Sequence, residues 1–137
     1  MEAYSLSIIG VLAVCLVSLL LASYSGRSKG AAGALSGPVL DARDDNKLYR
    51  IDRAHMNSVE ALAPFAVPAV IAMLVGVAPV LLAILVWLHV AIRLVHLFVY
   101  LRGGEAAKGG NLRTVLYVAS ALVTLVVIIV TAWSALM

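Results

Sequence analysis

Four long apolar stretches limit what this chain can fold into more than any other feature of its sequence. They run from about Ala3 to Ser23, Ala54 to Val75, Pro79 to Leu101 and Leu112 to Trp133. Each has the roughly 20 residues that a helix needs to cross a hydrocarbon core of about 30 Å. The chain is also 64% hydrophobic and only 12% charged, which excludes an ordinary soluble domain. We therefore expect an integral membrane protein of the all-α class, in which residues 1–137 form a single four-helix bundle.

Lysine and arginine gather on one side of the predicted bundle. They lie in the segment 24–53, in the segment that joins the third and fourth spans, and at the adjoining ends of the spans. Short loops rich in these residues face the cytoplasm. We therefore expect segment 24–53 to be a cytoplasmic loop, flexible from Ser25 to Gly37, with a second mobile turn between Gly103 and Gly110. Both termini would then be non-cytoplasmic, in a bacterial inner membrane or an endoplasmic reticulum. No basic block indicates nucleic-acid binding.

Polar residues form stripes on three of the predicted spans, near the ends that face the cytoplasm. Within each stripe the offsets of 3, 4 or 7 residues place the side chains on one helix face. Ionisable residues at membrane depth are costly, so this concentration predicts a functional site. The three stripes are Arg53, Asn57 and Glu60; Arg93, His96 and Tyr100; and Arg113 and Tyr117.

The chemistry of these stripes suits a small zwitterion. Guanidinium groups such as those of Arg53 and Arg93 bind carboxylates, whereas Glu60 can hold an ammonium group. Arg113 and Tyr117 open the fourth span, where Thr114 adds a hydroxyl group. A thiol placed there would lose its proton more readily, because cations and helix N-termini both lower a thiol pKa.

Simpler interpretations of the same residues stay open. Arg93 and Glu60 could form an internal ion pair that only holds two helices together. His89 and His96 lie on one face of the third span, but Glu60 is the one obvious further ligand, so we expect no metal site. Pro64 and Pro68 could bend the second span and open a pocket, or they could simply reflect how common proline is in membrane helices.

Three motifs resemble one known family, the membrane-associated proteins in eicosanoid and glutathione metabolism (MAPEG). The run from Arg53 to Glu60, Arg-Ala-His-Met-Asn-Ser-Val-Glu, is similar to its second-helix signature. Arg93-x-x-His96-x-x-x-Tyr100 resembles its third-helix motif, and Arg113-x-x-x-Tyr117 its fourth. The pattern is closest to the prostaglandin E synthase and microsomal glutathione transferase branches of the family. The resemblance covers roughly residues 1–135.

The resemblance implies a homotrimer that binds glutathione between subunits near the cytoplasmic side of the bilayer. It implies that Arg113 stabilises the thiolate, assisted by Thr114 or Tyr117. A lipophilic small molecule would reach the sulfur from the bilayer, in a transferase or peroxidase reaction. By the same analogy a further set of side chains holds the tripeptide: Arg53, Asn57, Glu60, Arg93, His96 and Tyr100.

The sequence departs from the family pattern at two of these positions. Met56 stands where an arginine is expected, and Thr114 stands where a serine is expected. Two other functions stay open on the sequence alone. One is a non-catalytic scaffold or ligand-binding protein, and the other, less favoured because no inverted repeat is present, is a small proton-coupled carrier.

Overall fold

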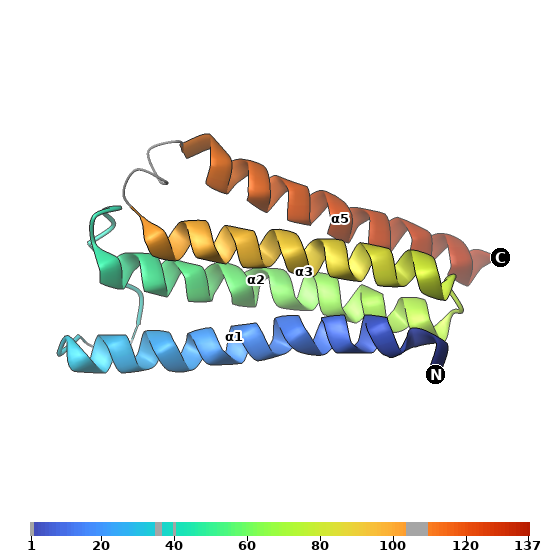
Figure 1. Cartoon of the computed structure of the whole chain (residues 1–137), viewed down its shortest axis with the longest axis horizontal. Helices are drawn as coiled ribbons and strands as arrows, with labels where there is room; N and C mark the ends of the chain where they lie inside the picture. The colour runs from blue at the N-terminus through green and yellow to red at the C-terminus, as the bar shows by residue number, and fades with distance from the viewer. Residues whose placement is uncertain (1, 35–36, 40, 104–109) are drawn as a thin grey trace.

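Four long helices lie side by side in this protein (Figure 1). The computed structural model describes residues 2–34, 37–39, 41–103 and 110–137. A short 3-10 turn, Glu2–Tyr4, precedes the first helix. The helices are α1 (Ser5–Ala31), α2 (Lys47–Leu74), α3 (Pro79–Arg102) and α5 (Gly110–Leu136).

All four helices are long and apolar enough to cross a membrane. The prediction of an all-α, four-span membrane protein is therefore confirmed. Leucines along α1 show why the chain needs lipid or a protein neighbour around it: Leu6, Leu12 and Leu19 are 60%, 61% and 65% exposed. A surface this apolar is not stable in water.

The helices extend beyond the predicted spans at the charged end of the bundle. The expectation of a flexible segment from Ser25 was wrong for Ser25–Ala31, which continue α1. Tertiary contacts explain the difference, because Ser25 and Lys29 both contact the buried carboxylate of Asp52 on α2. These contacts stabilise a helical stretch whose Gly and Ser content alone favours a loop. The predicted turn from Gly103 to Gly110 lies mostly outside the described residues.

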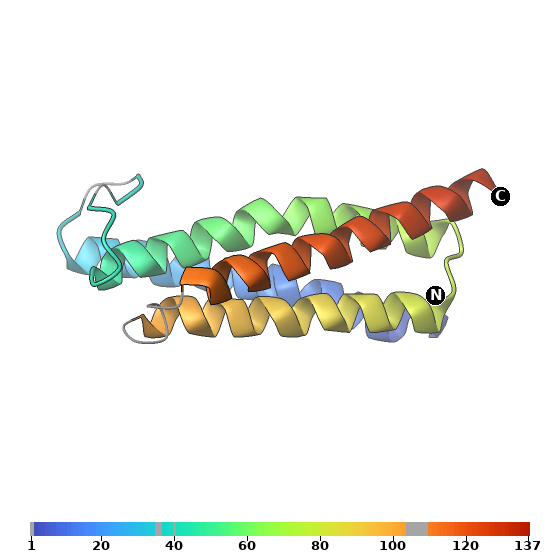
Figure 2. The same ribbon diagram turned by 90° about the horizontal axis from the view of Figure 1, so that it is seen from above.

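Both termini lie at one end of the bundle, opposite the segment between α1 and α2 (Figures 1 and 2). We call the end with the termini the termini end and the opposite one the loop end. At the termini end Gly76 has a positive φ of 81°, which makes the tight turn before Pro79 possible. The Tyr4 hydroxyl donates to Val77 O at 2.7 Å, and Trp87 Nε1 donates to Leu6 O at 3.1 Å. These bonds fix the start of α1 against α3 and the turn.

The hydrophobic core also lies toward this end, where Phe65, Leu82, Val86 and Val127 are fully buried. Helix α2 stays helical through both of its prolines. Toward the loop end α5 moves away from α2 and lies beside α3 (Figures 1 and 2). The bundle is therefore tightly packed at one end and more open at the other, where the polar residues lie.

Candidate functional site

The polar stripes of three helices meet in one open pocket at the loop end of the bundle. Its volume is about 290 Å³. We call it the polar pocket, and α2, α3 and α5 each contribute at least two side chains to it. Its lining residues are Arg53, Asn57, Glu60, His96, Tyr100, Arg113, Thr114 and Tyr117.

Arg113 holds a central place in the polar pocket. It lies in the first turn of α5, and its side chain is only 12% exposed. Its Nη1 is 2.8 Å from the carboxylate of Asp44, and its guanidinium carbon lies 4.5 Å from the centre of the Tyr100 ring. Its Nε and Nη2 are shielded from solvent and have no hydrogen-bond partner within the described structure. Two guanidinium nitrogens, which carry three N–H groups, thus have no partner among the described residues and can bind a ligand.

Arg53, Asn57 and Glu60 follow one another along the face of α2 that lines the pocket. Arg53 Nη2 donates to Asn57 Oδ1 at the long distance of 3.5 Å, which leaves most of the capacity of this guanidinium unused. Glu60 is exposed, and in the described part of the chain no Lys or Arg nitrogen lies within 4.0 Å of its carboxylate. The face therefore presents a cation and an anion that can each take an external partner.

Three rings form the wall between α3 and α5. His96 is 4% exposed and meets the Tyr100 ring nearly edge-on, with centroids 5.4 Å apart. The centre of the Tyr117 ring lies 6.5 Å from the centre of the His96 ring. No hydrogen bond of either tyrosine hydroxyl occurs among the described residues, and Tyr117 is 46% exposed. Both hydroxyl groups can therefore donate to a ligand in the pocket.

Arg93 is the one predicted site residue that does not line the polar pocket. Its Nη2 donates to the backbone carbonyl of Asn57, and its side chain borders a second cavity between α1, α2 and α3. The alternative of an ion pair between Arg93 and Glu60 is wrong, since the described residues contain no such pair within 4.0 Å. His89, also considered as a possible ligand, instead stacks on Phe65 with ring centroids 3.7 Å apart.

Comparison with known proteins decides the family. The MAPEG profile matches residues 5–133, which include α1, α2, α3, all but the last three residues of α5, and every residue of the polar pocket. The chain belongs to the MAPEG family. A search of curated proteins finds no match to it. The family assignment therefore comes from the profile, and the predicted resemblance to MAPEG is confirmed.

In this MAPEG protein two interactions near the site were not predicted from sequence. Asp44, in the segment before α2, pairs with Arg113. It lies among several charged residues, and nothing in the sequence indicated which of them would pair with Arg113. Lys29 on α1 is paired with Asp52 and also donates to Gly37 O at 2.6 Å. Arg27 is exposed on α1.

Proposed function

We propose that this protein is a glutathione-dependent transferase or peroxidase that acts on lipophilic electrophiles. The observation that supports the proposal most is the polar pocket itself, whose charges complement the tripeptide. Glutathione carries two carboxylates, one ammonium group and one thiol, whereas the pocket offers Arg53, Arg113 and Glu60 with several neutral donors. Membership of the MAPEG family, to which such enzymes belong, supports the same activity.

Each lining residue has a role in this proposal. Arg53, Asn57, His96 and Tyr100 bind the peptide and its carboxylates, and Glu60 takes the ammonium group. Arg113 stabilises the thiolate through the two guanidinium nitrogens that have no partner in the described structure. Thr114 and Tyr117 border the same part of the pocket and assist it. Arg93 supports the site from behind, by holding the backbone of Asn57.

The fixed positive charge of Arg113 explains how the thiol would be activated. The position of Arg113 in the first turn of α5 adds the positive end of the helix dipole to the guanidinium charge. Both favour the thiolate, which is the nucleophilic form of the thiol. In the transferase reaction the sulfur forms a bond to an electrophilic carbon of the substrate, and the leaving group departs with its electron pair.

We further propose that the protein works as a homotrimer in the bilayer, with its loop end facing the cytoplasm. The apolar outer faces of the helices support burial against lipid and against neighbouring copies. A lipophilic electrophile dissolved in the bilayer then reaches the sulfur without crossing water. The family membership supports the trimer, and the basic residues of the loop end support the orientation.

The test compares glutathione with S-methylglutathione, which keeps every charge of the tripeptide but cannot form a thiolate. Purified protein in detergent should be stabilised against heat by both peptides, because a ligand that binds only the folded state raises its stability. Only glutathione should add the ultraviolet absorbance of a thiolate at neutral pH. Stabilisation without a thiolate would favour a ligand-binding protein over an enzyme, and neither effect would favour a scaffold.

A further inference from the structure

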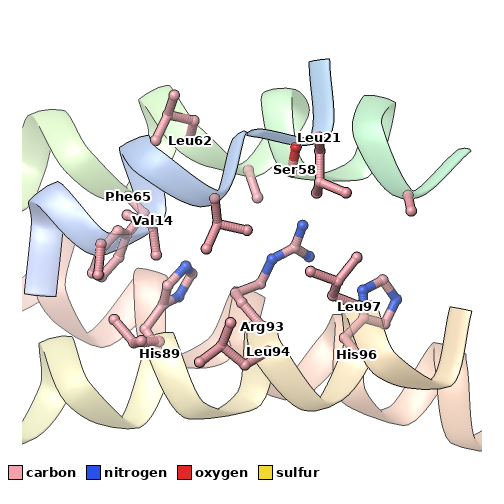
Figure 3. A pocket seen from close by; sticks show the side chains of 15 residues that line it. Val14, Leu21, Ser58, Leu62, Phe65, His89, Arg93, Leu94, His96 and Leu97 are labelled. Carbon is pink, nitrogen blue, oxygen red and sulfur yellow. The ribbon is translucent and has the colours of Figure 1, made fainter. Parts of the chain in front are cut away.

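The second cavity lies inside the bundle, between α1, α2 and α3, and is separate from the polar pocket. Its volume is about 60 Å³. Most of its lining side chains are aliphatic, such as Val14, Leu21 and Leu62. Figure 3 shows the Arg93 side chain entering this space between His89 and His96, with Ser58 on the opposite side. We call it the Arg93 cavity.

Arg93 brings a permanent positive charge to this apolar space without a carboxylate of the described residues in direct contact with it. Its Nη1 is shielded from solvent and has no hydrogen-bond partner within the residues that the structure describes. Its Nη2 binds a backbone carbonyl, which is polar but carries no net charge. Across the described ranges no carboxylate oxygen lies within 4.0 Å of this guanidinium. Arg93 is partly buried, and a cation at membrane depth without a direct ion-pair partner is stabilised by an anion that joins it.

From these contacts we infer that the Arg93 cavity binds a small monovalent anionic group. One guanidinium neutralises one negative charge, so a monoanion leaves the cavity neutral. A water molecule in the liquid occupies about 30 Å³, so the cavity has the volume of about two water molecules. This size fits a halide ion or a single carboxylate group without its hydration shell.

Two histidines lie beside this site, and one of them can add a donor to it. His89 and His96 are 2% and 4% exposed, and both line the cavity. The Thr124 hydroxyl donates to Ser120 O, so His89 Nδ1, 3.4 Å from Thr124 Oγ1, is the donor of that contact, and the neutral His89 ring has no N–H on Nε2. Neutral His96 also has one N–H, which no other described residue accepts, so an anion beside Arg93 would find donors from Arg93 and His96.

His96 connects the anion site with the polar pocket, because its side chain lines both the Arg93 cavity and the polar pocket. An anion beside Arg93 would therefore lie behind the wall that glutathione is proposed to touch. The anion site itself does not depend on that proposal, since it follows from the unpaired charge of Arg93 and the space beside it. Glutathione is accordingly left out of the test.

The anionic group could be a free ion from solution or the carboxylate of a membrane fatty acid whose chain stays outside the cavity, in the bilayer. Both sources can be compared by thermal unfolding in detergent, with sodium gluconate as the starting salt and constant ionic strength. Chloride, bromide and formate test the free ion. Decanoate tests the lipid carboxylate, with decanol as its uncharged control.

For the wild-type protein we expect a saturable rise in the unfolding midpoint with at least one of these anions. A response to chloride and formate identifies a free-ion site, and a response to decanoate but not to decanol or formate identifies a lipid carboxylate. Arg93→Met should abolish the response. Arg27→Met, which removes an exposed arginine from α1, should keep it.

Diffraction from wild-type crystals grown in bromide gives a readout that does not depend on the stability of a variant. An anomalous peak beside Arg93 Nη1 supports the free-ion form of the proposal. The proposal is overturned if none of the anions, decanoate included, stabilises the wild type and no bromide binds there. It is also overturned if Arg93→Met folds and responds like the wild type.

Discussion

Asp44 and Arg113 are 69 residues apart in the sequence and form an ion pair of 2.8 Å between the segment before α2 and the first turn of α5. The carboxylate of Asp44 is 59% exposed, whereas the guanidinium of Arg113 is 12% exposed. The arginine proposed to stabilise a thiolate is therefore already partly neutralised by the protein itself. The negative charge of Asp44 therefore limits how far Arg113 can lower the pKa of a bound thiol.

Replacing Asp44 should make the proposed thiol site more acidic. In Asp44→Asn the positive field of Arg113 is no longer opposed, so bound glutathione should ionise at lower pH. Exposed ion pairs contribute at most about 1 kcal/mol, and one pKa unit corresponds to about 1.4 kcal/mol, so we expect the thiol pKa to fall by up to about 0.7 units. A pH titration of the thiolate absorbance measures the shift. Asp45→Asn, which changes an exposed carboxylate paired with Arg43, should leave the titration unchanged.

Glu60 and Arg113 should affect different kinetic steps. Glu60→Gln removes the partner of the ligand's ammonium group and should weaken glutathione binding about 10- to 100-fold, the effect of losing one charge-assisted hydrogen bond. Arg113→Gln should change the glutathione Kd little but lower kcat by about 100-fold or more, because it removes stabilisation of the reacting sulfur. Calorimetric binding and turnover of a chloronitroarene separate the two effects. An Arg113→Gln protein with full turnover at neutral pH would contradict the role assigned to this residue.

Asn46 should stabilise the start of α2 and the segment that carries Asp44. Its Oδ1 accepts from the backbone N–H groups of Leu48 and Tyr49, as an N-cap side chain does. We expect Asn46→Ala to lower the free energy of unfolding by about 1 kcal/mol. Asn46→Asp keeps an acceptor at this position and should lose much less. Equal midpoints of thermal unfolding for the Ala variant and the wild type would show that this cap does not stabilise the helix.

Gly10 should be required for the close packing of α1 on α3. A methyl group at this position would overlap the side chain of Val86, which is fully buried. We expect Gly10→Ala to destabilise the protein by about 1–3 kcal/mol, as overpacked cores generally do. Gly26 provides the matched control on the same helix, because nothing lies within 4 Å of an added Cβ there. Gly26→Ala should be neutral or slightly stabilising in the same thermal assay, since alanine favours helix more than glycine does.

Much of the fold could be predicted from sequence because a bilayer imposes simple rules on length and hydropathy. The four spans and the meeting of their polar faces follow from these rules. The C-terminal turns of α1 could not be predicted, since Ser25 and Lys29 are held in a helix by Asp52, a residue distant in the sequence. The helix propensities of these residues alone do not predict that contact.

The candidate site shows the same division between local and tertiary information. Helical spacing places Arg93 on a stripe with His96 and Tyr100, and so predicted a shared pocket. The packing of α1 against α2 and α3 instead places Arg93 at a second cavity, which shares only His96 with the polar pocket. The partner of Arg113 could not be predicted either, because the ion pair with Asp44 depends on how the segment before α2 lies relative to α5. Spacing within a helix indicates which side chains share a face, but only the packed bundle decides what each face meets.

The most direct test of the account is a structure of the protein soaked with glutathione. We predict that the tripeptide occupies the polar pocket, with its sulfur within hydrogen-bonding distance of the Arg113 guanidinium and its ammonium group on Glu60. A pocket that stays empty at saturating glutathione, with every donor of Arg113 satisfied by Asp44 or by other groups of the protein, would contradict the account.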